Sequence, residues 1–250
     1  MPKILFFLII LGLLLLLLIQ ERTIITRFTA PLWEPYYLKM HGQVTVEETV
    51  QKLGKKAKKI LAPSFKKAGL AYPPQKLAIL AFKRERRLEI WGWEKEKWRY
   101  LKAYPILEAS GKAGPKLKEG DRQVPEGFYR ITGFNPNGNF YLTLILDYPN
   151  AFDRLQAEKE GRKNLGSEIC IHGGSSSVGC LAMGDPVSEE LFILCEAVGF
   201  QNVQVLICPN DFRLEKPLDE GQFSRPWVRE LYEKLQKELK KFPRPLRGVR

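Results

Sequence analysis

A histidine and a cysteine eight positions apart are the residues of this sequence best suited to chemistry. His172, one of two histidines, precedes a loop rich in glycine and serine that ends at Cys180. A free thiol ionises at about pH 8.5, so a neighbouring imidazole is needed to produce a nucleophilic thiolate at neutral pH. Gly173 and Gly174 allow the loop to fold back at once. The spacing suggests a nucleophile and its base; the alternative is a buried cysteine and a histidine that only stabilises a turn.

The end of the same loop could stabilise a negatively charged intermediate. Gly179 lacks a side chain, which leaves the backbone N–H groups of Val178, Gly179 and Cys180 open to approach. Backbone donors that point at a developing oxyanion lower the barrier to acyl transfer. These three residues are the predicted oxyanion hole.

Three segments upstream of the loop carry further distinctive residues. They are Gly114-Pro115-Lys116, the stretch GDRQVPEGFY at 120–129 and the stretch LDYPNAFD at 146–153. Together with the His172–Cys180 loop, and in this order, they resemble the L,D-transpeptidase catalytic domain (YkuD) family. The subgroup that they resemble most is that of the YafK-like murein L,D-transpeptidases. The resemblance covers about residues 75–212.

The resemblance implies a role for each residue of the loop. Cys180 is then the acyl-accepting nucleophile and His172 its base, while the backbone carbonyl of Gly173 orients the imidazole. Ser177 is expected to brace the loop. Two positions depart from the family pattern: Val178 stands where a histidine is usual, and Ala182 where an arginine is usual.

Tyr148, Asn150 and Ser177 are the predicted substrate-binding residues. Asn150 with Asp153 three positions later also has the pattern of a helix start. Tyr148 and Asn150 could therefore serve as turn and cap residues or line the substrate groove, and the sequence leaves both readings open.

The resemblance implies a peptidoglycan L,D-transpeptidase that acts on stem peptides through a cysteine thioester, for cross-linking or attachment in the cell wall. One alternative is a hydrolase of the same family, an L,D-endopeptidase or amidase. Another is a non-enzymatic protein that binds wall or membrane, and the departures at Val178 and Ala182 keep both open. No cofactor is expected. No metal is expected either, because the cysteines lack zinc-like spacing and His41 is the one remaining histidine.

The elements around the loop favour an α+β fold. Short runs rich in β-branched and aromatic residues predict strands at 76–82, 87–93, 98–103, 127–134, 140–147, 168–171 and 203–208. Asn150 begins a predicted helix, and Asp185 caps another that stops at Gly199. Strands dominate the first half and helices join in the second. We therefore expect a β-rich, mixed and mostly antiparallel sheet with helices packed on it, the catalytic fold that the resemblance also implies.

The positive charge of the chain is concentrated in two flanks. Residues 46–70 hold seven lysines and two glutamates, and residues 225–250 hold nine basic and three acidic residues, within a net charge of +12. Both flanks read as helices, at 46–67 with a break near Pro63 and at 226–241. They could be solvated helix faces or bind an anionic lipid or wall polymer. Nucleic acid is not an expected partner, because no recognition motif accompanies the charge.

The N-terminus carries an unbroken apolar run of 16 residues, Ile4–Ile19. No small-residue cleavage site follows it, so an uncleaved signal-anchor helix in the bacterial inner membrane is favoured over a cleaved signal peptide and secretion. The family implies that the catalytic domain faces the periplasm. The expected organisation is an anchor at 1–22, a basic helical linker at 23–70, a catalytic domain at 71–212 and a basic helical extension at 213–250.

The other three cysteines differ in where the pattern places them. Cys170 lies two residues before His172 on the same predicted strand, so both side chains face one side of the sheet. It could be a second thiol near the site or a buried structural residue. Cys195 and Cys208 are expected in the core. No disulfide pairing follows from the sequence.

Overall fold

The computed structural model describes residues 43–214 and 225–244. Its helices are α3 (Val46–Ala68), α4 (Ala151–Lys159), α5 (Asp185–Val198) and α6 (Pro226–Leu239), with a short 3-10 helix at Phe200–Asn202. Its strands are β1 (Lys76–Phe82), β2 (Arg87–Glu94), β3 (Lys97–Pro105), β4 (Glu108–Ala109), β5 (Gly127–Gly138), β6 (Tyr141–Leu146), β7 (Cys170–His172), β8 (Leu181–Ala182) and β9 (Val203–Cys208). The predicted strands and helices are present, with some of their ends displaced.

The strands form one sheet in the order β3-β2-β1-β9-β5-β6-β7-β8-β4. Among the described strands, β1 pairs with β9 and β7 pairs with β8 in parallel, and the other neighbours are antiparallel. This confirms the predicted mixed, mostly antiparallel α+β fold. The parallel pair β7 and β8 lies near one end of the strand order. His172 is the last residue of β7, and Cys180 directly precedes β8.

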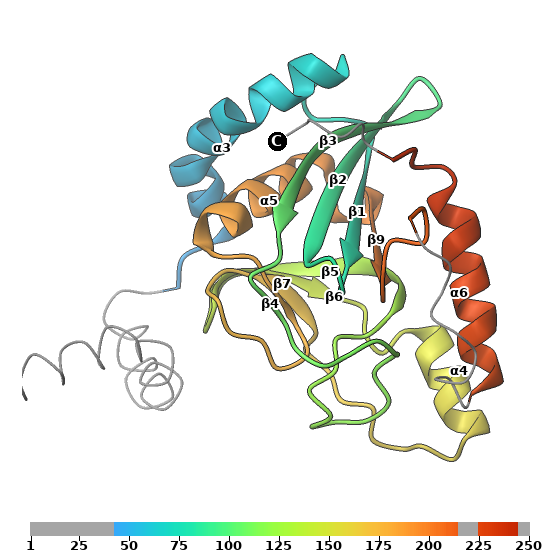
Figure 1. Ribbon diagram of the computed structural model, residues 1–250. Helices are drawn as coiled ribbons and strands as arrows, with labels where there is room; N and C mark the ends of the chain where they lie inside the picture. The colour runs from blue at the N-terminus through green and yellow to red at the C-terminus, as the bar shows by residue number, and fades with distance from the viewer. Residues whose placement is uncertain (1–42, 215–224, 245–250) are drawn as a thin grey trace, which may run out of the picture. The chain divides into compact units, whose positions relative to one another are not determined.

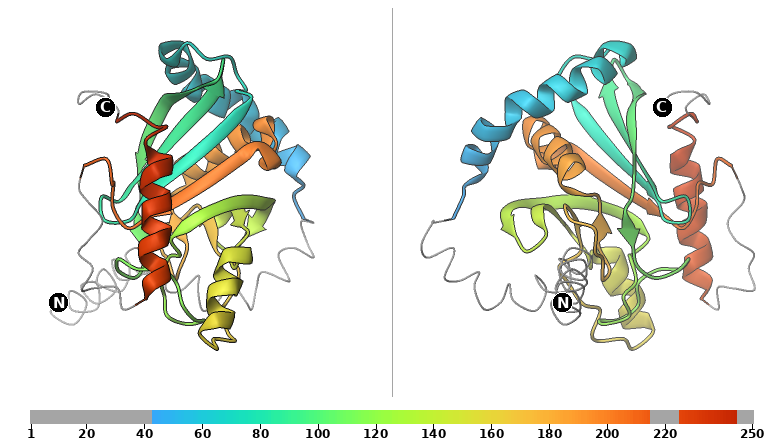
Figure 2. Two further views of the ribbon diagram at one scale, coloured as in Figure 1. Left: turned by 90° about the vertical axis from the view of Figure 1, so that its right-hand side faces the viewer. Right: turned by 60° about the vertical axis from the view of Figure 1, so that its left-hand side comes forward.

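Helices cover both faces of the sheet around β1 (Figures 1 and 2). Leu77 and Ile79 of β1 pack into a core that includes side chains of α3 and α5. Leu80 and Phe82 point the other way, into a second core shared with α6. Because successive side chains of a strand face opposite sides, β1 has to be apolar along nearly its whole length. All of its residues from 77 to 82 are fully buried.

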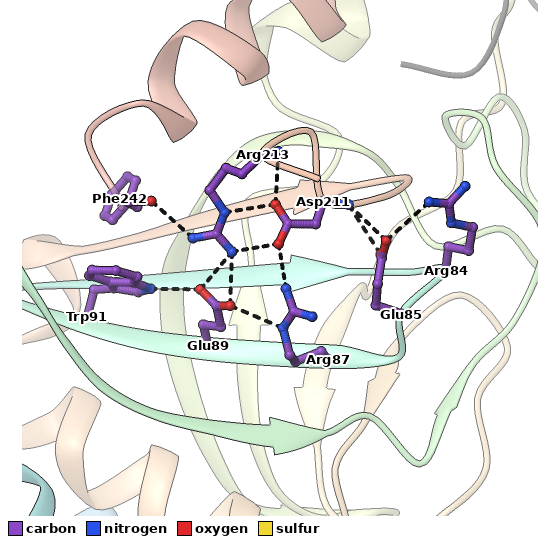
Figure 3. Close-up of polar contacts among 8 residues, drawn as sticks. All are labelled: Arg84, Glu85, Arg87, Glu89, Trp91, Asp211, Arg213 and Phe242. Carbon is purple, nitrogen blue, oxygen red and sulfur yellow. Dashed lines mark hydrogen bonds and ion pairs between the residues drawn. The ribbon is translucent and has the colours of Figure 1, made fainter. Parts of the chain in front are cut away.

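A buried ionic cluster ties the end of α6 to the sheet (Figure 3). Arg213, just after β9, donates to Glu89 of β2 at 2.9 Å, to Asp211 at 2.8 Å and to the backbone carbonyl of Phe242 at 3.0 Å. Arg87 bonds the same two carboxylates. Both carboxylates are almost wholly buried, and the opposite charges of the two arginines offset the cost of removing them from water.

A second buried ion pair connects α6 with the segment between β4 and β5. The carboxylate of Glu126 accepts from the Nζ of Lys83 at 2.8 Å, the hydroxyl of Tyr232 at 2.5 Å and the backbone N–H of Gly114 at 2.9 Å. Burial lowers the pKa of Lys83, and the attraction of Glu126 opposes that shift. Through Glu126, the helix α6 therefore helps to hold the segment that contains Gly114.

Two predictions about helix geometry are wrong. Helix α3 continues through Pro63, because Leu61 and Phe65 on either side are buried in the core and this packing outweighs the hydrogen bond that proline cannot donate. Asp185 is the first residue of α5 and not its cap. Gly184 occupies the cap position without a side-chain hydrogen bond.

Both basic flanks contain helices that belong to the same compact unit as the sheet. Helix α3 buries Ala57, Leu61 and Phe65, and α6 buries Val228 and Leu235, among others. The lysines of both helices lie on their exposed sides. Packing therefore runs across the predicted boundaries at residues 70 and 212.

The predicted anchor at residues 1–22 lies outside the described residues. Within the part of the chain that the structure describes, no helix combines the length and the apolarity that crossing a bilayer requires.

Candidate active site

The parallel pairing of β7 and β8 brings the two ends of the predicted catalytic loop together. His172 lies opposite Ala182 and Ile171 opposite Leu181. The loop between these strands folds back, as its glycines predicted. One step before the paired residues, the backbone N–H of Cys170 donates to the Sγ atom of Cys180 at 3.3 Å.

The imidazole of His172 is buried and held by two contacts. Its Nδ1 atom lies 2.5 Å from the backbone carbonyl oxygen of Gly173, the group that the family resemblance named for this role. The ring of Phe140 packs against it, with the two ring centres 4.8 Å apart. A carbonyl can only accept, so Nδ1 carries the proton and Nε2 is the atom free to act as a base.

Gly173 has no room for a side chain. A Cβ atom there would lie 2.7 Å from the Oδ1 of Asp185, 2.9 Å from the carbonyl oxygen of Phe140 and 3.0 Å from the Oγ of Ser188. The carboxylate of Asp185 accepts a hydrogen bond from the backbone N–H of Gly174 at 2.8 Å. The start of α5 therefore packs directly against the backbone that orients His172.

The surroundings lower the pKa of the Cys180 thiol to about 5. The largest cause is a hydrogen bond from the Cys170 thiol; burial acts in the opposite direction, and a hydrogen bond and electrostatic attraction from His172 lower the pKa further. Cys180 is then a thiolate at neutral pH and remains partly exposed. A thiolate beside an imidazole can attack a carbonyl carbon.

The pKa of the Cys170 thiol is shifted in the opposite direction. Its hydrogen bond with Cys180, followed by burial, raises the pKa of the Cys170 thiol. It therefore stays protonated. The contact between the two residues runs from the backbone N–H of Cys170 to the Sγ atom of Cys180, at 3.3 Å. The sequence placed Cys170 on the same side of the strand as His172, but it did not reveal this contact.

Two serines brace the segment before Cys180. The hydroxyl of Ser177 donates to the backbone carbonyl of Cys180 at 2.6 Å and lies 3.1 Å from the hydroxyl of Ser110. The oxygen of Ser110 also accepts from the backbone N–H of Gly179 at 2.7 Å. The bracing predicted for Ser177 is present. Ser110 was not predicted, because a single serine after a two-residue strand gives no signal in the sequence.

The contact with Ser110 bears on the predicted oxyanion hole. Of its three backbone donors, that of Gly179 already bonds a hydroxyl oxygen. The backbone N–H groups of Val178 and Cys180 therefore remain the predicted donors to the oxyanion. The side chain of Val178 is exposed, whereas Ala182, at the other departure from the family pattern, is fully buried.

Tyr148 and Asn150 have structural contacts. The hydroxyl of buried Tyr148 donates to the backbone carbonyl of Leu165 at 3.0 Å. Asn150 caps α4 in a reciprocal capping box with Asp153 and donates to the carbonyl of Phe128 at 2.8 Å. The cap reading is confirmed for Asn150. The binding of substrate by these two residues and by Ser177 stays a prediction.

A groove of about 740 Å³ lies elsewhere on the molecule and contains neither Cys180 nor His172. It is formed by parts of β1, β5 and β9 and the start of α4, and Asn150 is among its lining residues. Within the described ranges, no three histidine, cysteine, aspartate or glutamate side chains are grouped as metal ligands would be.

Comparison with known proteins gives consistent matches. The sequence model of the L,D-transpeptidase catalytic domain, YkuD, matches residues 77–207. The protein named "Putative L,D-transpeptidase YafK" from Escherichia coli strain K12 is 34% identical over 136 residues, which are 52% of this chain and 53% of that protein. This chain thus spans about half the length of the curated relatives that it matches.

Solved structures also match. That of the helical cell shape determining protein Pgp2 from Campylobacter jejuni is 24% identical, with a TM-score of 0.44 over 54% of this chain and 48% of that one. That of L,D-transpeptidase 1 from Mycobacterium tuberculosis is 12% identical, with a TM-score of 0.31 over 53% of this chain and 62% of that one.

Proposed function

Because this chain belongs to the L,D-transpeptidase catalytic domain (YkuD) family, we propose that it transfers acyl groups of peptidoglycan stem peptides through a thioester on Cys180. The observation that carries the proposal is the pairing of β7 with β8, which brings Cys180 to the strand that ends at His172, whose imidazole is oriented by Gly173; the surroundings lower the pKa of Cys180. A thiol that has given its proton to the neighbouring imidazole attacks a peptide carbonyl as a thiolate, and the proton stays on His172 for the leaving group.

The first half of the proposed reaction forms the thioester. The Cys180 sulfur attacks the carbonyl carbon of a residue at an L-configured centre, and the backbone N–H groups of Val178 and Cys180 bind the resulting oxyanion. The C–N bond then breaks, and the nitrogen of the leaving D-amino acid takes the proton that Nε2 of His172 had accepted from the Cys180 thiol. The hydrogen bond to Gly173 keeps the ring in place through this step.

The second half of the reaction releases the acyl group. An incoming amine attacks the thioester, His172 takes its proton, and the thiolate of Cys180 leaves. The product is a new peptide bond. Orientation of the amine and exclusion of water favour this outcome.

Hydrolysis by the same site is the second candidate function. It differs only in that water, and not an amine, attacks the thioester. The observation that favours it is the absence of two polar side chains that the family pattern expects next to the nucleophile. Val178 is apolar and exposed, and Ala182 is buried and cannot contact a substrate.

Incubation of the full-length protein with purified muropeptides, followed by mass analysis, tests both candidates. Transfer gives a new cross-link or attached amine, and hydrolysis gives a shortened peptide. Cys180→Ala should reduce turnover roughly 10³-fold or more. Cys195→Ala, which removes a fully buried thiol, is the matched control and should retain activity. If Cys180→Ala turns over as fast as the control, the proposal is wrong.

We also propose that the apolar run Ile4–Ile19 anchors the chain in the inner membrane, with the catalytic domain in the periplasm and the exposed lysines of α3 and α6 facing anionic lipid or wall polymer. Protease added to spheroplasts should then digest the catalytic domain. Protection of that domain until the membrane is broken would contradict the orientation.

A further inference from the structure

The proposed reaction gives Cys170 no chemical step, although its thiol lies beside the nucleophile. The backbone N–H of Cys170 donates to the Sγ atom of Cys180 at 3.3 Å. The Sγ atoms of both also lie close to the backbone carbonyl oxygen of Glu168, at 3.4 Å and 3.5 Å. The two sulfurs therefore share one small space.

The backbone places these cysteines at a distance that a disulfide can bridge. They precede the paired residues Ile171 and Leu181 of two adjacent parallel strands. Neighbouring strands lie about 4.8 Å apart, and the Cα atoms of disulfide-bonded cysteines are usually about 4.4–6.8 Å apart. The backbone hydrogen bond from Cys170 to the sulfur of Cys180 fixes this register.

The exposure of the four cysteines separates this pair from the others. Cys170 and Cys180 are partly exposed, whereas Cys195 and Cys208 are completely buried. A small oxidant in solution can therefore reach the pair but not the other two thiols. All four are reduced in the structure.

We propose that Cys170 is a resolving thiol, which closes a reversible disulfide with Cys180 when the nucleophile is oxidised by a hydroperoxide. The thiolate of Cys180 attacks one oxygen of hydrogen peroxide, the O–O bond breaks, and hydroxide leaves, so Cys180 becomes a sulfenic acid. The sulfur of Cys170 then attacks the sulfur of Cys180. The S–O bond breaks, and the hydroxyl group leaves as water with the proton of Cys170. In total, one thiolate, one thiol and one peroxide give one disulfide, one water and one hydroxide.

The geometry assigns the two roles in a fixed order. The ionised sulfur of Cys180 reacts first, because the thiolate is the nucleophilic form. Cys170 attacks second. Once Cys180 is a neutral sulfenic acid, the negative charge that helped to raise the pKa of Cys170 is gone, and the Cys170 sulfur is close enough to react before a second peroxide does. The disulfide stops acyl transfer and prevents irreversible oxidation to sulfinic acid, and a thiol reductant restores the enzyme.

A protease that cleaves after glutamate makes this testable on the full-length protein. The fragment Ile169–Glu189 contains Cys170 and Cys180 but neither Cys195 nor Cys208. Reduced protein is treated with an equimolar amount of hydrogen peroxide, and the remaining thiols are alkylated. The protein is then digested, and the masses of the fragments are measured by mass spectrometry. We expect a fragment that is lighter than the reduced one by two hydrogens and carries no alkyl group. Reductant before alkylation should restore two alkylation sites.

Two variants make the result decisive. In Cys170→Ser, treated with an excess of hydrogen peroxide because each oxygen gained consumes one peroxide, the disulfide should be absent, and the fragment should gain two or three oxygens that reductant does not remove. Cys195→Ala should behave as the natural sequence. The proposal is overturned if both cysteines of the fragment are alkylated after peroxide, or if Cys180 is over-oxidised while Cys170 is alkylated.

The inference rests on the reactive thiolate of Cys180 and not on its substrate. The assay contains no peptidoglycan, so a disulfide without acyl transfer would refute only the proposed function. Acyl transfer without a disulfide would refute only the resolving role of Cys170.

Discussion

The aromatic ring of Phe140 lies against the imidazole of His172, with the planes inclined by 30°. Phe140 lies in the turn between β5 and β6 and is itself exposed, so it covers the histidine from the solvent side. No pattern in the sequence predicted a contact between these two residues. Their contact and the hydrogen bond to Gly173 together fix the ring on two sides.

Phe140→Ala should lower turnover of stem peptides by roughly 10- to 100-fold, because an imidazole that can tilt spends less time aligned with Cys180. Steady-state kinetics on muropeptides measures the effect. Phe128→Ala is a matched control, since Phe128 is similarly exposed but lines the groove away from Cys180. Equal turnover in the two variants would contradict the positioning role of Phe140.

Gly173→Ala should both destabilise the protein and impair the site. Its Cβ would approach a backbone oxygen and two side-chain oxygens at 2.7–3.0 Å, and the backbone oxygen cannot move aside cheaply. We expect a loss of about 1–3 kcal/mol in the free energy of unfolding, measured by urea denaturation. Gly54→Ala, inside α3 with only one distant neighbour at 3.8 Å, should instead stabilise by up to about 1 kcal/mol. A neutral Gly173→Ala would disprove the close packing.

Cys170→Ala should raise the pKa of Cys180, because it removes the hydrogen bond that contributes most to the low value. The rate of alkylation of Cys180 against pH measures this directly, with a midpoint of about 5 in the natural sequence. The midpoint should move upward in Cys170→Ala and less in Cys170→Ser, whose hydroxyl can still donate. An unchanged midpoint in Cys170→Ala would show that His172 alone sets the ionisation.

Arg213→Met should cost about 3–5 kcal/mol of unfolding free energy, because it leaves the buried carboxylates of Glu89 and Asp211 with less compensation. Lys56→Ala, which breaks an exposed pair with Glu189, should cost at most about 1 kcal/mol. Chemical denaturation at neutral pH compares the two. Similar losses would mean that the cluster in Figure 3 contributes no more than a surface ion pair.

The same cluster predicts how stability depends on pH. Burial by itself would raise the pKa of Asp211, but the hydrogen bonds and charge of Arg213, with the charge of Arg87, hold it below the usual value. A carboxylate with a lowered pKa in the folded state stabilises the fold above its unfolded pKa of about 3.9, and this contribution disappears as the pH falls through the folded value. Stability should thus fall below about pH 4. The fall should be smaller in Asp211→Asn.

Local patterns were sufficient to predict the longer strands and the start of α4. The apolar run of β1 and the pair Asn150 and Asp153 are read within a few residues of sequence, and both have the predicted structure. The predicted helix break at Pro63 was wrong, because the burial of Leu61 and Phe65 outweighs the local preference of proline. That burial depends on distant parts of the chain.

In the candidate site, too, local contacts could be predicted and contacts between distant residues could not. His172 and Cys180 could be paired from their short loop, which can close in few ways. The contact between Cys170 and Cys180 depends on the register of two parallel strands, and that of Ser110 with Gly179 joins positions 69 residues apart. Neither register nor such distant contacts can be read from residue types.

The carboxylate of Glu126 has a practical consequence for any work on this molecule. Tyr232 of α6 bonds one of its oxygens, and the other holds Gly114, whose carbonyl in turn accepts from the amide of Gln123. The backbone of Gln123 lies against Gly179, so the chain of contacts that begins on the last helix ends one residue from the reactive sulfur. A recombinant fragment that ends with the matched segment at residue 207 would lack α6 and would lose these contacts, which support the backbone next to Cys180. Protein for assays should therefore include the C-terminal helix.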